Sequence, residues 1–226
     1  MDYFKIISKE LNEIIISYLF SIYDIKIFLN SFGVSGLNWG TIYSYHFGKY
    51  KNILFNEYLN RIGAESLRDK LKLTNTIDEL LNFKVLDLSR NQLTQVPPEI
   101  GILTNLQVLH LSYNKLTQVP PEIGNLKNLK YLYLDNNNLA RVPSEIGNLN
   151  KLIVLTLNDN QLKQLPKEIG KLTNLQSLHL SYNNLERVPP EIENLTNLQL
   201  LYLNNNRNIQ VPSEIYRLNK LKIHYR

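Results

Sequence analysis

Leucines recur at a fixed spacing along the second two-thirds of the chain. The string Leu86-Asp-Leu-Ser-Arg-Asn-Gln-Leu93 is followed 23 residues later by Leu109-His-Leu-Ser-Tyr-Asn-Lys-Leu116, and the pattern begins again at Leu132, Leu155, Leu178 and Leu201. No insertion interrupts the six units. A period of roughly 20 to 50 residues is typical of proteins built from stacked repeats, so we expect one fold unit repeated six times.

Each unit contains two different local patterns. In Leu86-Asp-Leu88 the leucines alternate with a polar residue, which predicts a short strand with both leucines on one face. An asparagine follows where the chain must turn, and its amide can pair backbone groups that would otherwise be buried without partners. These asparagines are Asn91, Asn114, Asn137, Asn160, Asn183 and Asn206. A proline then precedes Glu-Ile and predicts the start of a short helical turn. These prolines are Pro97, Pro120, Pro143, Pro166, Pro189 and Pro212.

The Leu-x-x-Leu-x-Leu-x-x-Asn-x-Leu core of the unit resembles the leucine-rich repeat, and the following Val/Leu-Pro-x-Glu-Ile-x-x-Leu resembles its intracellular type. The resemblance covers roughly residues 77–226. It implies an α/β horseshoe-shaped solenoid with a parallel β-sheet on the concave side, because one unit cannot bury its leucines alone. We expect a helical cap over residues 1–73 and a repeat domain over residues 74–226, made of a half-unit plus six repeats.

The two ends of the repeat array differ in sequence. Ile77, Leu80 and Phe83 occupy the positions of later repeat residues and predict the leading half-unit. At the other end, alternation over 221–225 predicts a last strand with Leu221, Ile223 and Tyr225 facing inward. No polar cap follows this strand. Its edge is a candidate contact surface, either left exposed or covered by a second copy in a homodimer.

Residues 1–73 lack the repeat, and their apolar positions have helical spacing. Stretches 11–19, 22–32 and 38–62 predict three helices. The N-terminal segment contains the string Glu10-Leu11-x-x-x-Ile15-x-x-Tyr18-Leu19, followed by Asp24-Ile25. This pattern resembles the F-box, a three-helix motif that docks on the adaptor subunit of SCF-type ubiquitin ligases. The resemblance implies adaptor contacts for Leu11, Ile15, Tyr18, Leu19 and Ile25. Ser8 stands where the family has a characteristic proline, so the alternative is a cap that only shields the first repeat.

Composition and charge narrow the function classes. The chain has no cysteine, which excludes disulfides and thiolate metal sites and fits an intracellular, cytoplasmic protein, in the host cell if the chain is viral. The net charge of +5 is spread evenly, with 9 basic and 7 acidic residues in 1–73 against 16 and 13 in the rest. No segment has the density of basic residues that nucleic acids require. The longest apolar run in 1–73 is too short to span a membrane.

No motif indicates an enzyme or a cofactor. His110 and His179 lie three repeats apart, so at strand spacing they stand about 14 Å from each other, too far to share a metal. One glutamate precedes the Ile of each unit, at the start of a short helical turn. This regular position indicates a structural role and not a catalytic acid-base pair. Phosphate-binding and nucleophile motifs are absent from the sequence. We therefore expect no catalytic residue, no metal and no cofactor.

The residues between and after the paired leucines point to binding. Alternation places them on the concave face, where Tyr and His are favoured as contact residues. The candidate protein-binding residues are His110, Tyr113, Tyr131, Tyr133, Asp135, Thr156, Asn158, His179, Tyr182 and Tyr202. The resemblance to the F-box implies a substrate receptor of a ubiquitin ligase, with a protein or peptide bound on this face of the leucine-rich repeats. A stand-alone interaction scaffold is the alternative function. For the rings of this face, the alternative is that neighbouring aromatic side chains stack on one another as surface decoration.

Overall fold

The computed structural model describes residues 51–225. Helix α4 (Lys51–Leu71) is followed by the short helix α5 (Ile77–Leu81). A boundary between two compact units falls after Ile62, inside α4, and the unit from Gly63 onward contains every strand of the described part.

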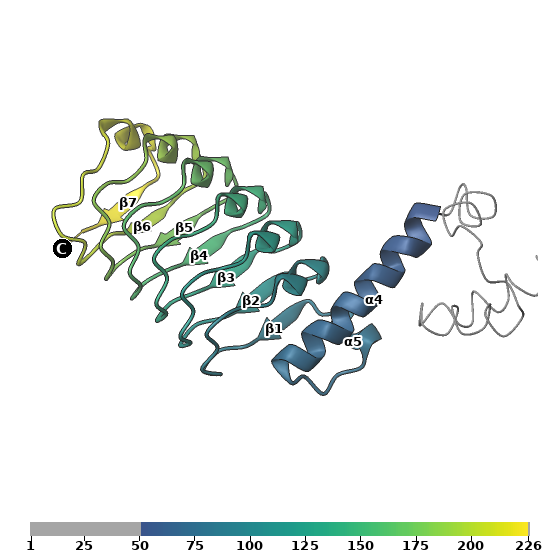
Figure 1. The fold of residues 1–226 in the computed structure, drawn as a ribbon. Helices are drawn as coiled ribbons and strands as arrows, with labels where there is room; N and C mark the ends of the chain where they lie inside the picture. Colours follow the sequence, from purple (N-terminus) through teal and green to yellow (C-terminus); the bar gives the residue numbers. More distant parts are fainter. Residues whose placement is uncertain (1–50, 226) are drawn as a thin grey trace, which may run out of the picture. The chain divides into compact units, whose positions relative to one another are not determined.

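Seven three-residue strands alternate with six 3-10 helices (Figure 1). The strands are β1 (Val85–Asp87), β2 (Val108–His110), β3 (Tyr131–Tyr133), β4 (Val154–Thr156), β5 (Ser177–His179), β6 (Leu200–Tyr202) and β7 (Lys222–His224). The 3-10 helices are η1 (Pro98–Ile102), η2 (Pro121–Asn125), η3 (Ser144–Asn148), η4 (Lys167–Lys171), η5 (Pro190–Asn194) and η6 (Ser213–Arg217). The leucine-rich-repeat fold expected from the sequence is therefore present, with 3-10 turns where the sequence predicted helical starts.

The strands form one parallel sheet in the order of the chain, β1 to β7. Its register follows the sequence period, since Leu86 pairs with Leu109 and Leu178 pairs with Leu201. Figure 1 shows the 3-10 helices along the side of the repeats away from the strands. Each repeat therefore lines the same core with a strand on one side and with a helical turn on the other.

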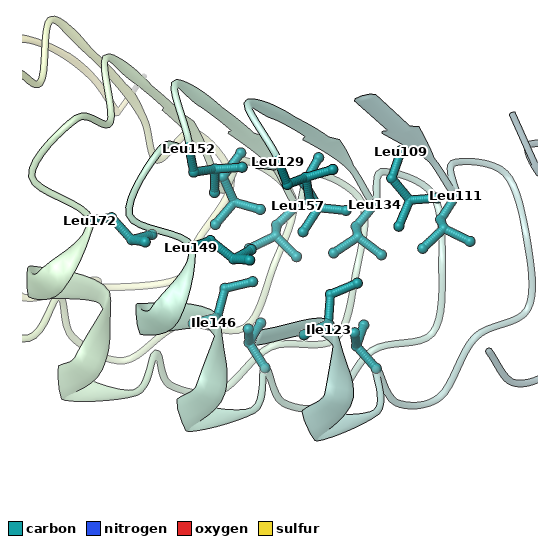
Figure 2. Close-up of a cluster of buried hydrophobic side chains, with 14 of the residues drawn as sticks. Leu109, Leu111, Ile123, Leu129, Leu134, Ile146, Leu149, Leu152, Leu157 and Leu172 are labelled. Carbon is teal, nitrogen blue, oxygen red and sulfur yellow. The ribbon is translucent and has the colours of Figure 1, made fainter. Parts of the chain in front are cut away.

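The core is a continuous stack of fully buried leucines and isoleucines (Figure 2). From β2, Leu109 points inward together with Leu111, and Ile123 closes the same repeat from η2. Burial of each such side chain contributes about 1.5–3 kcal/mol. Because every repeat supplies equivalent residues, each layer is covered by the next, and stability depends on contacts between neighbours.

Prolines fix the start of each 3-10 helix, as predicted. Pro97 precedes η1 with φ −61°, and Pro166 precedes η4 with φ −67°. In three repeats a second proline occupies the first helical position, where its missing N–H has no partner to lose. The proline therefore sets the direction of the chain as it leaves the loop.

Buried asparagines hold the turn after each strand. The Nδ2 of Asn160 donates to the carbonyls of Leu134, Leu157 and Asn158 at 3.0–3.2 Å, and its Oδ1 accepts from the N–H of Leu139 at 3.0 Å. One amide thus pairs four backbone groups in two repeats, with the two N–H donors of its Nδ2 shared among three carbonyls. Corresponding bonds are made by Asn114, Asn137, Asn183 and Asn206.

Asn91, in the first repeat, is not part of this ladder. It is exposed, and its side chain makes no hydrogen bond within residues 51–225. The prediction of one role for all six asparagines is therefore wrong at Asn91. The physical reason is that no full repeat precedes it, so the carbonyl that the preceding repeat supplies to each later asparagine is absent there.

Neighbouring 3-10 helices approach most closely at a glycine. A Cβ added to Gly147 in η3 would lie 2.4 Å from the carbonyl oxygen of Glu168 in η4. The equivalent residue of η5 is Glu193, which forms a 2.8 Å ion pair with Arg217 of η6. The backbones of η3 and η4 therefore require glycine, and those of η5 and η6 leave room for a side chain.

On the N-terminal side, the second half of α4 and the half-unit cover the first repeat. Ala64 and Leu67 are fully buried together with Leu80, and Ile77 and Phe83 pack against them. Ile77, Leu80 and Phe83 are the residues that the sequence assigned to the half-unit. The predicted end of the third helix near residue 62 is wrong: α4 continues to Leu71, because an apolar stripe of Ala64, Leu67 and Leu71 faces the core.

At the other end, the last strand is confirmed, with one correction. Leu221 and Ile223 pack against the core, but Tyr225 is 44% exposed and its hydroxyl lies 3.4 Å from that of Tyr216. The last repeat is one residue shorter, since Leu201 pairs with Ile223. Tyr225 occupies the position of Leu203 in this register, and no further repeat of the described chain covers it.

Candidate functional site

The outward side chains of β1 to β7 form a surface that we call the open sheet face. They alternate with fully buried leucines, so that His110 lies between Leu109 and Leu111 and projects to the other side of the sheet. Tyr131, Tyr133, His179 and Tyr202 are half-buried on this face. The backbone beneath them is fixed by the ladder, which presents these rings from a rigid support.

Five aromatic or histidine side chains of this face form two stacks of rings, and one threonine lies between the two stacks. In the first ring stack, His110 and Tyr133 have centroids 4.5 Å apart and planes 6° apart. In the second ring stack, Tyr202 lies between His179 and His224 at centroid distances of 4.5 and 4.6 Å. These distances follow the spacing of paired strands, about 4.8 Å. The second ring stack was predicted without His224, because the one-residue deletion moves it out of the 23-residue period.

Thr156 separates the two ring stacks. It is only 7% exposed, and its hydroxyl donates to the carboxylate of Asp135. The same carboxylate accepts from the backbone N–H of Asn158 at 3.0 Å and from the hydroxyl of Ser112 at 3.4 Å. Asp135 and Thr156 were predicted as binding residues. In the structure the Thr156 hydroxyl and the Asp135 carboxylate form a hydrogen bond with each other, and the carboxylate also accepts from the backbone.

A row of residues with left-handed backbone runs along one margin of the open sheet face. Their φ angles lie between 53° and 59°, and they are Arg90, Tyr113, Asn136, Asp159, Tyr182 and Asn205. Asn and Asp adopt this conformation readily, but a tyrosine rarely does. Tyr113 and Tyr182 are nevertheless found there, 51% and 56% exposed. Strained residues of this kind cluster at binding sites.

A pocket of about 250 Å³ opens between the second ring stack and this margin. It is lined by Asn158, Asp159, His179, Ser181, Tyr182 and Tyr202. Four of the ten predicted binding residues therefore meet at one place. His110, Tyr113, Tyr131 and Tyr133 do not line it.

The electrostatics of the pocket are dominated by one carboxylate. Within residues 51–225, the side chain of Asp159 makes no hydrogen bond or ion pair. Burial lowers the pKa of the His179 imidazole below its ordinary value, and the charge of Asp135 raises it by less. His179 is therefore neutral near pH 7, with its Nε2 2.8 Å from the Ser177 hydroxyl. The only formal charge in the lining is negative.

The described part of the chain offers no metal centre and no membrane span. Among residues 51–225, no cluster of three or more His, Asp or Glu side chains has the arrangement that a metal ion requires. No helix in this part is long and apolar enough to cross a membrane. The predicted adaptor-binding residues Leu11, Ile15, Tyr18, Leu19 and Ile25 lie outside the described residues.

The family described as "Leucine-rich repeat region" matches the chain over residues 64–160 and 144–223. The chain belongs to the leucine-rich-repeat family. Among solved structures, a leucine-rich-repeat protein of Leptospira interrogans is 38% identical with a TM-score of 0.54; the match covers 68% of this chain and 45% of that one. The plant peptide hormone receptor RGFR1, solved in complex with RGF2, is 36% identical with a TM-score of 0.52, and the match covers 58% and 22%.

This leucine-rich-repeat chain thus spans less than half the length of either relative. No curated protein is significantly similar to it. Both matches support the repeat fold and say nothing of an F-box in residues 1–50.

Sequence reasoning missed three residues of the site. Asp159 and Ser181 line the pocket, and His224 extends the second ring stack. The signal for Asp159 was present in the repeat period, because it stands one repeat before Tyr182. His224 needed the strand register, since the deletion that shifts it is visible only from the pairing of β6 with β7.

Proposed function

We propose that this leucine-rich-repeat chain is a non-enzymatic binding module whose open sheet face captures a protein or peptide segment. The observation that carries the proposal is the pair of half-exposed ring stacks on a rigid sheet, with a pocket beside the second. Aromatic side chains on a fixed backbone lose little conformational entropy on binding and are favoured as hot spots. Leucine-rich-repeat proteins are typically non-enzymatic, which agrees with this function.

The similarity to the plant receptor supports a peptide as partner. That receptor is described as a peptide hormone receptor in complex with RGF2, and it shares 36% identity with this chain. The identity of the partner here is a separate matter, because the match covers 22% of the receptor.

The arrangement of the ring stacks indicates how long a bound segment must be. The first ring stack belongs to β2 and β3 and the second to β5, β6 and β7, so their centres are about 17 Å apart at ordinary strand spacing. An extended segment covers this distance with about five residues. A ligand that contacts both ring stacks therefore needs two apolar or aromatic anchors about five residues apart.

We expect Tyr202→Ala to weaken peptide binding about tenfold, because it removes the central ring of the second ring stack. Peptides of twelve residues are selected from a random displayed library, and the affinity of the enriched peptides is measured by fluorescence anisotropy. Tyr133→Ala tests the first ring stack in the same assay.

Tyr216→Ala is the matched control for these variants. Tyr216 is also a solvent-accessible tyrosine, 67% exposed, but it belongs to η6 and not to the open sheet face. Its removal should leave affinity within a factor of two. A library that yields no enriched peptide, or peptides that bind both tyrosine variants as well as the parent, would contradict the proposed function.

A more specific role as the substrate receptor of a ubiquitin ligase rests on the F-box-like pattern of the N-terminal segment. Leu11, Ile15, Tyr18, Leu19 and Ile25 would then bury themselves in the adaptor subunit. In this proposal residues 1–73 form the helical segment and residues 74–226 the repeats that hold the substrate. The competing proposal gives the helices only the capping role, which the burial of Ala64 and Leu67 supports for the end of α4.

Affinity purification from a eukaryotic lysate discriminates between the two roles. If the segment is an F-box, the full chain recovers the adaptor, and the double variant Leu11→Asp, Tyr18→Asp loses it, because charged residues cannot be buried in an apolar interface. Tyr202→Ala serves as the control that keeps adaptor binding. Recovery of no adaptor, or equal recovery with the double variant, would support the capping role.

Two further expectations go with these proposals. An intracellular location is required for the ligase role, and the absence of cysteine fits it. The homodimer through the strand edge at β7 stays a prediction, to be tested by sedimentation of the purified chain.

A further inference from the structure

We infer that the pocket beside β5 and β6 binds a lysine or arginine side chain of the captured segment. This inference rests on the proposed function and names the chemical class that the pocket selects. It begins from charge: Asp159 is the only charged group in the lining, and within residues 51–225 it has no compensating partner. A cation at this point gains an ion pair, and an anion would meet an uncompensated carboxylate.

A contact of the same kind, between a cation and a tyrosine ring, already exists within the repeats. In the first two repeats, the guanidinium of Arg90 lies 4.3 Å from the ring centroid of Tyr113. Arg90 and Tyr113 occupy the same left-handed position in neighbouring repeats. This arrangement is a cation-π interaction between adjacent members of the row.

Three repeats further on, Tyr182 is the equivalent of Tyr113, and Asp159 is the equivalent of Arg90. The ring is kept, but the cation beside it has been replaced by an anion. Tyr182 is 56% exposed and has no cation over its face among the described residues. A lysine or arginine from a ligand would rest on the Tyr182 ring and pair with Asp159 at once.

The size and the other walls of the pocket agree with a single side chain. About 250 Å³ is below the range typical of sites for whole small molecules, roughly 300–1,000 Å³. Tyr202 supplies a second ring, and Asn158 supplies a side-chain oxygen that already accepts from the Ser181 N–H at 2.9 Å. Neutral His179 adds no repulsion to a cation.

Library selection followed by an isosteric exchange tests the inference. We expect the enriched peptides to carry a Lys or Arg beside an apolar anchor. Replacing that residue by norleucine or citrulline, which removes the charge and keeps the length, should weaken binding to the parent protein about tenfold.

The protein variant Asp159→Asn should reduce the preference for the charged peptide from about tenfold to about two- to fivefold, because only the cation-π contact with Tyr182 then remains. Asparagine is well tolerated at φ 53°, so the fold is kept. Asp87→Asn is the matched control, because Asp87 is on the open sheet face at β1 and does not line the pocket. It should retain the tenfold preference.

The failures of the two proposals are distinguishable. Peptides that depend on Tyr202 but lack Lys and Arg would leave the proposed function standing and overturn the cation pocket. The cation pocket is also overturned if Asp159→Asn keeps the full preference for the charged peptide. A selection that enriches no peptide overturns both proposals.

Discussion

Asn160→Ala is expected to lower the free energy of unfolding by about 3 kcal/mol. The amide of Asn160 pairs three carbonyls and one N–H, and alanine removes all four bonds. The Leu139 N–H is left in the core without a partner, whereas each carbonyl keeps one other donor, from Asn137, Asn183 or the backbone of Asn136. Each buried group left unpaired costs about 1–3 kcal/mol, reduced where water enters the space vacated by the side chain. Urea unfolding followed by circular dichroism measures the loss. Hydrogen exchange should show faster exchange at the Leu139 N–H.

Asn91→Ala provides the control for this variant. It removes the same side chain from the same position of the repeat, but at Asn91 the side chain is exposed and makes none of these bonds. We expect a change within about 0.5 kcal/mol, as for an ordinary surface substitution. Equal losses for the two variants would show that the asparagine acts through turn propensity and not through the ladder.

Gly147→Ala is expected to destabilise the fold by about 2 kcal/mol. The new Cβ would lie 2.4 Å from the carbonyl oxygen of Glu168, which is backbone and can move only if η3 and η4 separate. Forced separation of packed elements costs roughly 1–3 kcal/mol. The same denaturation experiment measures it, and the effect should extend to the affinity of the open sheet face only weakly, because β3 and β4 lie across the core.

Glu193→Ala is the matched control in the neighbouring pair of 3-10 helices. Glu193 stands at the glycine position of η5, so alanine there adds no new atom, and the variant loses only an exposed ion pair with Arg217. Such pairs contribute about 0–1 kcal/mol. A loss at Gly147 no larger than that at Glu193 would mean that the repeats shift apart easily.

The fold was predictable from the sequence because it depends on what the repeats share. Leu86 and Leu109 are paired by their 23-residue separation alone, and a proline marks the start of each 3-10 helix. Where the period changes, prediction was weaker. The missing residue before Ile223 brings His224 beside Tyr202 and leaves Tyr225 exposed, and only the strand register reveals both.

The candidate site was harder to predict because it depends on how the repeats differ. Alternation places Thr156 and His179 on the same face, yet Thr156 is buried by its bond to Asp135 and His179 borders an open pocket. That distinction arises from side-chain hydrogen bonds, which spacing does not encode. The left-handed backbone at Tyr182 was equally hidden, since the sequence offers a tyrosine where asparagine or glycine is usual.

The unbroken period of the sheet has a consequence for how this surface can change over time. Because every insertion-free repeat adds one strand, equivalent residues of the open sheet face are separated by whole multiples of about 4.8 Å. Loss or duplication of a single 23-residue unit between Tyr133 and His179 moves the two ring stacks by one such step and leaves each of them intact. Recombination between similar gene segments can thus alter the length of the ligand that fits, without a single substitution in the residues that touch it.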